Sequence, residues 1–388
     1  MPWNDLANNQ TISFTNLKDS VDTGVFAQKT TVPVSNEQIT KSEADTYVWI
    51  DNSFGPYASK TSNQLVVKSN LQCAVPVTNT TNLEWWGIAN NETTSSPIQL
   101  IVGQNNNADG RIFRSTDYGA NYSSVLLIND FLRGIKFAPN FRHASYLTVT
   151  PFVAVGEGGR IVTNSVQDAT SWITISSPTV QNLFDCSFNL LGRGVIVGLN
   201  RILRTNTDYR INAWSIVNSV GAAWTSVAND GYNFVAVGLN DSVITAGPLA
   251  TTWTVRSMPP LSPLGIDLYA VTYHTDGYFY AVGNGSGAVG AYIMRSSDQG
   301  VNWSAYVPTG YDLFTSVLFS IESINGRLVI GGINYQYQIR DNVVTRCGAT
   351  SGGVEIIWND IVKDAATSSG FDMAGEGRFG PSGAYSNF

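Results

Sequence analysis

Charged residues and histidine are scarce in this chain. Only 13% of its 388 residues are Asp, Glu, Lys or Arg, and there are two histidines. The 22 basic residues are mostly arginines scattered singly, against 29 acidic residues. A nucleic-acid groove needs clustered cations to displace counterions, so binding to DNA or RNA is not expected. A charge-rich disordered chain is excluded as well.

Cysteine is also rare, and its three positions, Cys73, Cys186 and Cys347, lie far apart without a CxxC pair. With only His143 and His274 to add, a zinc site would be short of ligands. We interpret the cysteines as small apolar core residues, although the sequence leaves one disulfide open. We expect no metal and no cofactor.

Long apolar runs are missing. No run approaches the roughly 20 residues that a membrane-spanning helix needs. The first residues, Met1 to Asp5, have neither the basic nor the apolar part of a secretory signal. We therefore expect a protein made in the cytosol, which reaches any exterior position by assembly or lysis.

Glycine and aromatic residues are abundant, with 36 Gly, 17 Phe, 17 Tyr and 10 Trp, and 43% of the residues are hydrophobic. One motif recurs about every 45 residues: an apolar run ending in glycine, a polar turn, a second apolar run, then Ser or Thr and often Trp. This period is the length of a four-stranded propeller blade. The sequence predicts an all-β, seven-bladed β-propeller of four-stranded antiparallel blades. The blade glycines are Gly103, Gly156, Gly198, Gly238, Gly283, Gly331 and Gly375.

Strands can be assigned within the fourth repeat. Residues 224–228 are predicted as the inner strand, followed by a tight turn at 229–231. The second strand, Phe234–Gly238, is fully apolar because neighbouring blades would cover both of its faces. Residues 242–246 and 253–255 form the third and the outer fourth strand.

The ends of the chain suggest how the ring closes. The last repeat supplies about three strands between Trp358 and Gly380, without an outer strand. We expect Gln64–Lys68 to complete it, so that opposite ends of the chain pair and no sheet edge is exposed. The predicted domains are an N-terminal docking segment, 1–48, and the propeller, 49–388.

The N-terminal segment does not follow the repeat. Residues 11–14 and 31–34 are typical of short strands, and a helix is predicted over 35–47 with Ser35 as N-cap. The segment is too small for its own core. It either lies on the propeller or docks onto another chain, and the sequence favours neither.

Two octapeptides, 115–122 and 296–303, resemble the Asp-box, Ser-x-Asp-x-Gly-x-x-aromatic, of sialidase-like propellers. In those families the box is a structural turn at the blade periphery. The Asp side chain accepts backbone N–H groups across a hairpin, and the aromatic residue packs between sheets. The matching positions are Ser115, Asp117, Gly119, Tyr122, Ser296, Asp298, Gly300 and Trp303.

Two further resemblances concern larger regions. Residues 84–380 have the repeat pattern of the photosystem-assembly-factor type of propeller. The residues Trp3–Leu6, Gly24–Phe26 and Ile39–Asp45 resemble a leader segment of virion and surface proteins of Bacteroidetes phages, including the crassvirus group. That resemblance implies a protein mounted on a particle.

Catalytic motifs are weak. A sialidase needs three clustered arginines, but Arg114, Arg204 and Arg295 recur at one strand position, which indicates a structural role. Glycosidases need two facing carboxylates. Acidic residues that could face a channel mouth are Asp185, Asp230, Asp267 and Asp276. We do not expect an enzyme. Candidate binding loops, rich in small polar and aromatic residues, carry Tyr335, Tyr337, Asn284 and Asn106.

The sequence therefore favours a non-enzymatic phage virion component, in the tail or an appendage, for adhesion to the host surface or support of an adhesin. Its expected partners are other virion proteins, through the N-terminal segment, and a host-surface glycan or protein. Multiple copies per particle would strengthen weak contacts. Two alternatives remain, a glycan-cleaving propeller hydrolase and an intracellular assembly scaffold.

Overall fold

The computed structural model describes residues 83–379 and five short strands between residues 11 and 68. Inside 83–379 it leaves out 106–108, 118–120, 144–148, 207–209, 212, 219–221, 259–264, 286–289, 312–313, 315–316, 334, 349–353 and 364–370. The chain divides into two compact units, Met1–Gln72 and Cys73–Phe388. The sequence had placed residues 49–72 with the propeller.

The N-terminal unit contains two small sheets. Strand β3 (Gln38–Lys41) lies between β1 (Thr11–Ser13) and β2 (Thr30–Thr31), and β4 (Tyr57–Thr61) pairs with β5 (Gln64–Lys68). One prediction is wrong here. Residues 38–41 of the predicted helix form β3, because Ile39 and Thr40 are β-branched and pair across the sheet with β1; the rest of 35–47 lies outside the described residues. The segment Gln64–Lys68 is a strand, as expected, and it pairs with β4, two residues away, at little loop-closure cost. Its completion of the last repeat stays a prediction.

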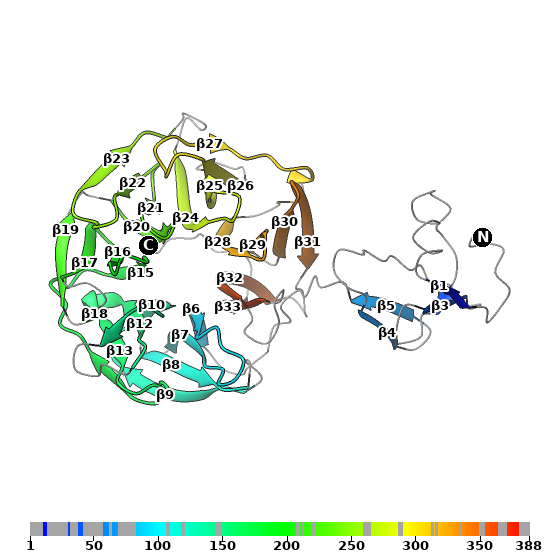
Figure 1. The fold of residues 1–388 in the computed structure, drawn as a ribbon, viewed down its shortest axis with the longest axis horizontal. Helices are drawn as coiled ribbons and strands as arrows, with labels where there is room; N and C mark the ends of the chain where they lie inside the picture. Colours follow the sequence, from blue (N-terminus) through cyan, green and yellow to red (C-terminus); the bar gives the residue numbers. More distant parts are fainter. Residues whose placement is uncertain are drawn as a thin grey trace. The chain divides into compact units, whose positions relative to one another are not determined.

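The C-terminal unit is a ring of sheets (Figure 1). Six sheets have four antiparallel strands in chain order. The strands are β6 (Leu83–Asn90), β7 (Gln99–Asn105), β8 (Gly110–Ser115), β9 (Ser123–Ile128); β10 (Leu132–Phe137), β12 (Phe152–Gly156), β13 (Ile161–Asn164), β14 (Trp172–Thr174); β15 (Leu183–Phe188), β16 (Gly194–Gly198), β17 (Arg201–Thr205), β19 (Trp214–Asn218); β20 (Trp224–Asn229), β21 (Phe234–Gly238), β22 (Val243–Ala246), β23 (Trp253–Arg256); β24 (Ile266–Tyr273), β25 (Phe279–Gly285), β26 (Ala291–Ser296), β27 (Ser304–Ala305); β28 (Leu318–Ile324), β29 (Arg327–Gly332), β30 (Tyr335–Arg340) and β31 (Val343–Gly348).

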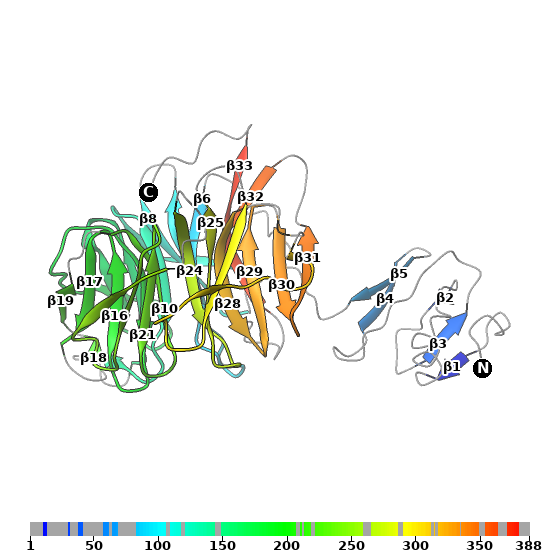
Figure 2. The same ribbon diagram turned by 90° about the horizontal axis from the view of Figure 1, so that it is seen from above.

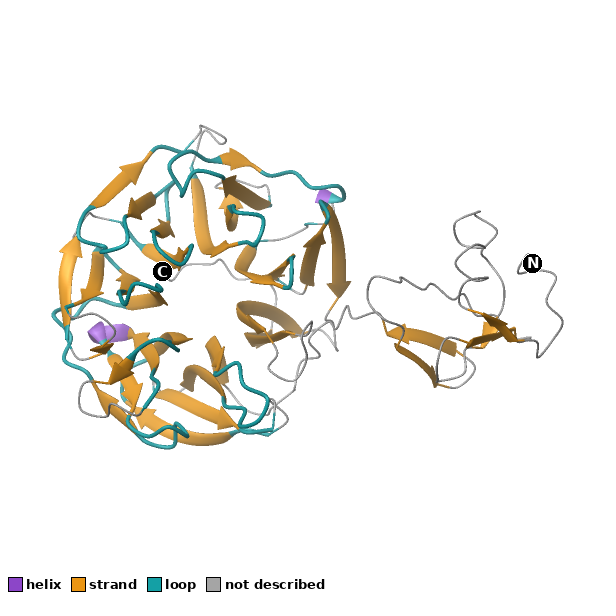
Figure 3. Cartoon of the chain, in the orientation of Figure 1, coloured by secondary structure: helices purple, strands orange, loops and turns teal. Residues whose placement is uncertain are grey.

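A seventh, two-stranded sheet pairs β32 (Val354–Lys363) with β33 (Phe371–Phe379). This repeat was expected to supply about three strands, but the structure has two, because residues 371–379 pair with β32 along its whole length. A short parallel pair, β11 (Arg142–His143) and β18 (Arg210–Ile211), joins loops of the second and third sheets. The 3₁₀ helix η3 (Glu157–Gly159) connects β12 to β13. Strands dominate the architecture (Figure 3).

In the six four-stranded sheets, the first strand lies nearest the ring axis and the fourth lies at the periphery (Figure 1). The inner strands β6, β10, β15, β20, β24, β28 and β32 contact one another in this order, and β32 contacts β6. Figure 2 shows the C-terminal unit edge-on, with its strands running roughly along the ring axis. No helix among the described residues is long and apolar enough to cross a membrane.

The fourth repeat confirms the strand assignment made from sequence. The strands are β20 to β23, and β21 is buried along its whole length. The turn between β21 and β22 has Asn240 and Asp241 at φ values of 55° and 58°. Two successive left-handed residues are typical of the type I′ turn that matches strand twist.

The core lies between neighbouring sheets. Val155 of β12 belongs to one buried cluster with Ile196 of β16. In the same way, Val195 of β16 packs in a cluster with Phe234 of β21. Each second strand thus has one face against the preceding sheet and the other against the following sheet, which explains its uninterrupted apolar sequence.

The recurring glycines of the second strands mark close backbone contacts. A Cβ atom on Gly156 would collide with the carbonyl oxygen of Phe131, and one on Gly283 with the carbonyl oxygen of Asp267. Phe131 directly precedes the inner strand β10, and Asp267 is the second residue of the inner strand β24. The same contact therefore recurs between the first and second strands of a sheet. The recurring glycine is therefore required by backbone packing.

We predict that Gly283→Ala lowers the free energy of unfolding by about 1–3 kcal/mol, because the backbone oxygen of Asp267 cannot move aside easily. Gly247→Ala is the control, since a Cβ there meets no atom within 4 Å. Thermal and urea unfolding of the two variants measure the difference. Equal stability of the two would contradict this account.

Candidate functional site: the central channel

Each of the seven inner strands has a register shift at the same place, where one extra residue bulges from the ladder. All seven of these residues are half-buried and line the central channel. We call them the collar. The collar residues are Trp86, Arg133, Phe184, Thr225, Tyr269, Phe319 and Asn359.

The channel encloses a cavity of about 570 Å³, lined by inner strands of all seven sheets. Four of the seven collar side chains are aromatic. The guanidinium of Arg133 lies over the ring of Trp86 at 4.4 Å and forms an ion pair with Glu157. The rings of Tyr269 and Phe319 are 5.2 Å apart. The collar is therefore a mainly aromatic surface carrying one cation that is already paired.

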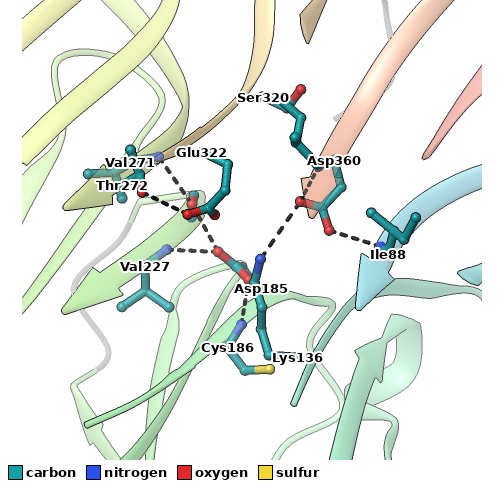
Figure 4. Close-up of polar contacts among 12 residues, drawn as sticks. Ile88, Lys136, Asp185, Cys186, Val227, Val271, Thr272, Ser320, Glu322 and Asp360 are labelled. Carbon is teal, nitrogen blue, oxygen red and sulfur yellow. Dashed lines mark hydrogen bonds and ion pairs between the residues drawn. The ribbon is translucent and has the colours of Figure 1, made fainter. Parts of the chain in front are cut away.

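Asp185, which directly follows the collar residue Phe184, links the third and fourth sheets (Figure 4). Its Oδ1 accepts the backbone N–H of Cys186 on its own strand at 2.7 Å. Its Oδ2 accepts the backbone N–H of Val227 on the next inner strand at 3.0 Å, and the hydroxyl of Ser226 at 2.9 Å. One carboxylate thus satisfies equivalent N–H groups of two adjacent sheets.

Asp360 does the same where the ring closes. Its Oδ1 accepts the N–H of Ile361 at 2.9 Å, and its Oδ2 accepts the N–H of Ile88, 272 residues away in the first sheet, at 3.0 Å (Figure 4). Asn359 adds a bond from its Nδ2 to the carbonyl oxygen of Trp85 at 2.8 Å. These side chains tie the last sheet to the first.

Smaller residues occupy the equivalent position in other sheets. Ser226 accepts the N–H of Val271 at 3.3 Å, and Ser320 donates to the carbonyl oxygen of Trp358 at 3.0 Å. Gly134 lets the strands touch, since a Cβ there would lie 2.5 Å from the carbonyl oxygen of Phe184. The residue after the bulge therefore controls how adjacent inner strands meet.

The described cavity lining contains one lysine, Lys136. Its Nζ lies 3.7 Å from Asp360 Oδ1. Burial opposes its charge, but attraction to Asp360, with smaller contributions from Asp185 and Glu322, raises the pKa of Lys136. Burial raises the pKa of Glu322 and of Asp360, and Lys136 partly offsets both effects. Glu322 Oε1 accepts the hydroxyl of Thr272 at 3.2 Å and the N–H of Ser323 at 3.0 Å.

We predict that Asp360→Ala lowers the free energy of unfolding by about 1–3 kcal/mol, because it leaves the buried N–H of Ile88 without its acceptor. Asp341→Asn is the control, since Asp341 has a 92% exposed side chain and Asn, like Asp, tolerates the left-handed φ of 49° at this position. Urea denaturation followed by tryptophan fluorescence gives both values. A loss for Asp360→Ala no larger than that of the control would be inconsistent with closure by this side chain.

Two of the four acidic residues suggested by sequence line the cavity, Asp185 and Asp230. Asp267 instead accepts the N–H of Asn240 at 2.9 Å. Asp276 accepts the hydroxyl of Tyr280 at 2.7 Å. Neither belongs to the described cavity lining, so that expectation was wrong for both: Asp267 binds the turn between β21 and β22, and Asp276 binds a tyrosine of β25. Asp230 lines the cavity although its Oδ1 also accepts local N–H groups, from Tyr232 at 2.8 Å and Asn233 at 2.7 Å.

Sequence reasoning missed Lys136, Glu322, Asp360 and the whole collar. A signal was present in the repeats, since each collar residue directly follows Leu or Trp at the start of an inner strand and precedes a Gly, Ala, Ser or Asp. Alignment of the repeats on the first strand, and not on the glycine of the second, would have shown it.

A serine–histidine contact occurs away from the cavity lining. His274 Nδ1 lies 2.8 Å from Ser323 Oγ, and the imidazole packs edge-on against Tyr280. Burial lowers the pKa of His274. Asp276 is engaged by Tyr280 and the N–H of Tyr278. The contact joins β24 to β28 as a packing interaction.

The two Asp-box-like turns lie between the third and fourth strands of their sheets, away from the channel. Asp117 Oδ1 accepts the N–H of Asn121 at 2.9 Å, and Asp298 Oδ1 accepts that of Asn302 at 2.8 Å. Hydrogen bonds from Ser115 and Asn121 lower the pKa of Asp117 to about 2. Trp303 Nε1 donates to Gly300 O at 2.9 Å. These bonds hold the turns locally; Gly119 lies outside the described residues.

The recurring arginines lie on third strands. Arg114 donates through Nε to the carbonyl oxygen of Asp168 on the neighbouring sheet. The guanidinium of Arg295 lies over Tyr278 and Tyr306, at 5.1 and 4.9 Å. Arg204 is on β17. These contacts are peripheral packing contacts and do not form a carboxylate-binding cluster.

The candidate binding loops are not loops where the structure describes them. Tyr335 and Tyr337 lie in β30, and Tyr337 is fully buried against Phe314, so it offers no surface. Asn284 lies in β25, paired with Asp267. Asn106 falls outside the described residues. The alternating tyrosines and glutamines of β30 were interpreted as a loop rich in polar and aromatic residues, but they belong to a strand.

Metal ligands do not converge in the described part of the chain, where no group of three or more His, Cys, Asp or Glu is placed to hold an ion. Cys186 is a free, buried thiol whose pKa burial raises well above its usual range. This confirms its interpretation as a core residue. Cys73 and the side chain of Cys347 are not described.

Comparison with known proteins supports the fold. No family model and no curated protein matches the sequence. A solved structure described as YCF48 bound to D1 peptide has a TM-score of 0.55 at 14% identity, covering 78% of this chain and 93% of that chain. YCF48 from Cyanidioschyzon merolae has a TM-score of 0.56 at 11% identity, covering 79% and 96%. YCF48 is a β-propeller photosystem assembly factor, so these similarities identify the fold of this chain as a β-propeller.

Proposed function

We propose that this chain is a non-enzymatic binding protein whose collar holds a segment of a protein partner. The observation that carries the proposal is the collar itself, in which seven equivalent bulges from seven sheets direct four aromatic side chains into one cavity. A pocket with an aromatic rim and a few polar groups is typical of ligand binding.

The use of the channel carboxylates supports a non-catalytic role. Asp185 and Asp360 each accept two backbone N–H groups from adjacent sheets, and Glu322 accepts two further bonds on one oxygen. A general acid or nucleophile must be free to exchange protons or attack substrate. These carboxylates instead maintain the ring.

A peptide is the form of partner that we favour. A structural neighbour with the same fold was solved with a peptide bound. By analogy, the rigid ring would act as a scaffold, and its partner would contribute an extended segment to one face. The analogy is one of fold, and the D1 peptide is not implied as the ligand here.

We further infer that the two-stranded sheet is the seventh blade. Its inner strand has the same bulge, at Asn359, as the six four-stranded sheets, and Gly375 pairs with Trp358 as the other blade glycines pair with their inner strands. Its small size leaves the outer half of that blade to be supplied by other residues of the chain or by a partner.

The biological setting that we propose is a phage particle, in the tail or an appendage, with the N-terminal unit attached to another virion protein. The resemblance of residues 3–45 to phage leader segments motivates this proposal. Host-surface adhesion or support of an adhesin would follow from displaying a rigid ring in many copies.

We predict that dodecapeptides selected from a random display library against the intact chain bind Phe319→Ala at least tenfold more weakly, because truncation removes an anchor at the collar. Val255→Ala, which alters a 60% exposed residue on the outer strand β23, is the control. Calorimetry of synthetic peptides measures the affinities. Peptides that bind all three proteins equally would rule out the collar as the site.

Mass spectrometry of purified virions tests the setting. We expect the chain in particles purified on a density gradient, at several copies relative to the portal protein. Its presence only in the soluble fraction of infected cells, together with a host protein, would favour an intracellular scaffold and reject the virion role.

A further inference from the structure

We infer that the channel selects a partner segment bearing a basic side chain, lysine or arginine, whose charged end enters the cavity beneath the collar. The inference rests on the proposed function and specifies the ligand chemistry of the same site.

The charges that line the cavity motivate it. The lining contains two cations, Arg133 and Lys136, and four carboxylates, those of Asp185, Asp230, Glu322 and Asp360, which leaves a formal charge of −2. Arg133 is already paired with Glu157. A cationic ligand would therefore neutralise the excess negative charge of the cavity lining.

The position of the charges favours an inserted side chain. Lys136 and Asp360 have side chains 32% and 21% exposed, so the cavity reaches both. Burial raises the pKa of Glu322 and Asp360, which means that an additional positive charge nearby would favour their ionised forms. Asp185, Glu322 and Asp360 lie on inner strands of the third, sixth and seventh sheets (Figure 4), and Asp230 directly follows the inner strand of the fourth sheet.

The collar suits the rest of such a side chain. Lysine and arginine have apolar stems that pack on aromatic rings, and their charged ends are attracted to ring faces. Phe184, Tyr269 and Phe319 supply these rings. The contact of Arg133 with Trp86 shows the same cation–aromatic geometry within the protein at 4.4 Å.

A metal ion fits less well than an organic cation. The described carboxylates are not grouped as ion ligands, and Asp185 and Asp360 direct their oxygens at backbone N–H groups of neighbouring strands. Charge spread around a cavity of about 570 Å³ suits a guanidinium or ammonium group on a flexible stem.

The experiment uses the intact chain and a random dodecapeptide display library. We expect peptides whose binding depends on Phe319 to be enriched in Arg and Lys over the input library. In the most enriched synthetic peptide, replacement of the key arginine by citrulline, which keeps the shape and removes the charge, should weaken binding at least tenfold.

Variants test the charge itself. Glu322→Gln keeps the Oε1 acceptor for Thr272 and Ser323, so the fold should persist, and arginine-peptide affinity should fall severalfold. Lys136→Met should raise that affinity, because the cavity becomes more negative. Asp341→Asn, a matched surface charge change, should leave it unaltered. Citrulline-peptide affinity should be the same for all four proteins.

The outcomes separate the two proposals. Collar-dependent peptides without basic enrichment, or equal affinity of the arginine and citrulline peptides, would overturn the cationic ligand and leave the collar site standing. Peptides that bind the Phe319→Ala variant as tightly as the unchanged protein would overturn both the collar site and the cationic ligand. An increase in arginine-peptide affinity on Glu322→Gln would also contradict the inference.

Discussion

The ring depends on one constraint: the inner strand of each sheet is an edge, and its axis-facing N–H groups must find acceptors. Buried N–H groups without partners are costly. Asp185 and Asp360 solve this by accepting one N–H from their own strand and one from the next. Where Gly134 stands in the same position, the strands approach closely instead. This single repeated position thus sets how adjacent inner strands meet, while the buried clusters between sheets supply the core.

The same constraint gives the channel its chemistry. Acceptors placed at the axis bring carboxylates into a confined space, where Lys136 balances part of their charge. The bulge that precedes each acceptor turns one more side chain toward the axis, and this side chain makes no contribution to the ladder. The collar positions can therefore vary in sequence, as Trp86, Thr225 and Asn359 show, while the ring is kept. Some collar residues also support the architecture, since Asn359 Nδ2 donates to the carbonyl oxygen of Trp85 and Thr225 Oγ1 donates to that of Leu268 on the next inner strand.

The sequence was least informative where local signals competed with pairing. The Ser35 and Gln38 capping pattern predicted a helix, but β3 forms because its β-branched residues gain partners in β1. Strand Gln64–Lys68 was recognised, and its partner was not, because an alternating strand does not specify which edge it joins. Asp267 illustrates the same difficulty for the site, since a carboxylate near a strand end can serve a turn as readily as a channel.

What the sequence by itself determined was the repeat: a period of about 45 residues, the apolar second strand and its terminal glycine. These follow from local periodicity and from close packing that no larger residue permits, as at Gly283. The tertiary structure alone decided the collar, the pairing of Lys136 with Asp360 and the contact of Asp360 with Ile88 across the whole ring. Those interactions join residues far apart in the chain, and their geometry exists only once the seven sheets share an axis.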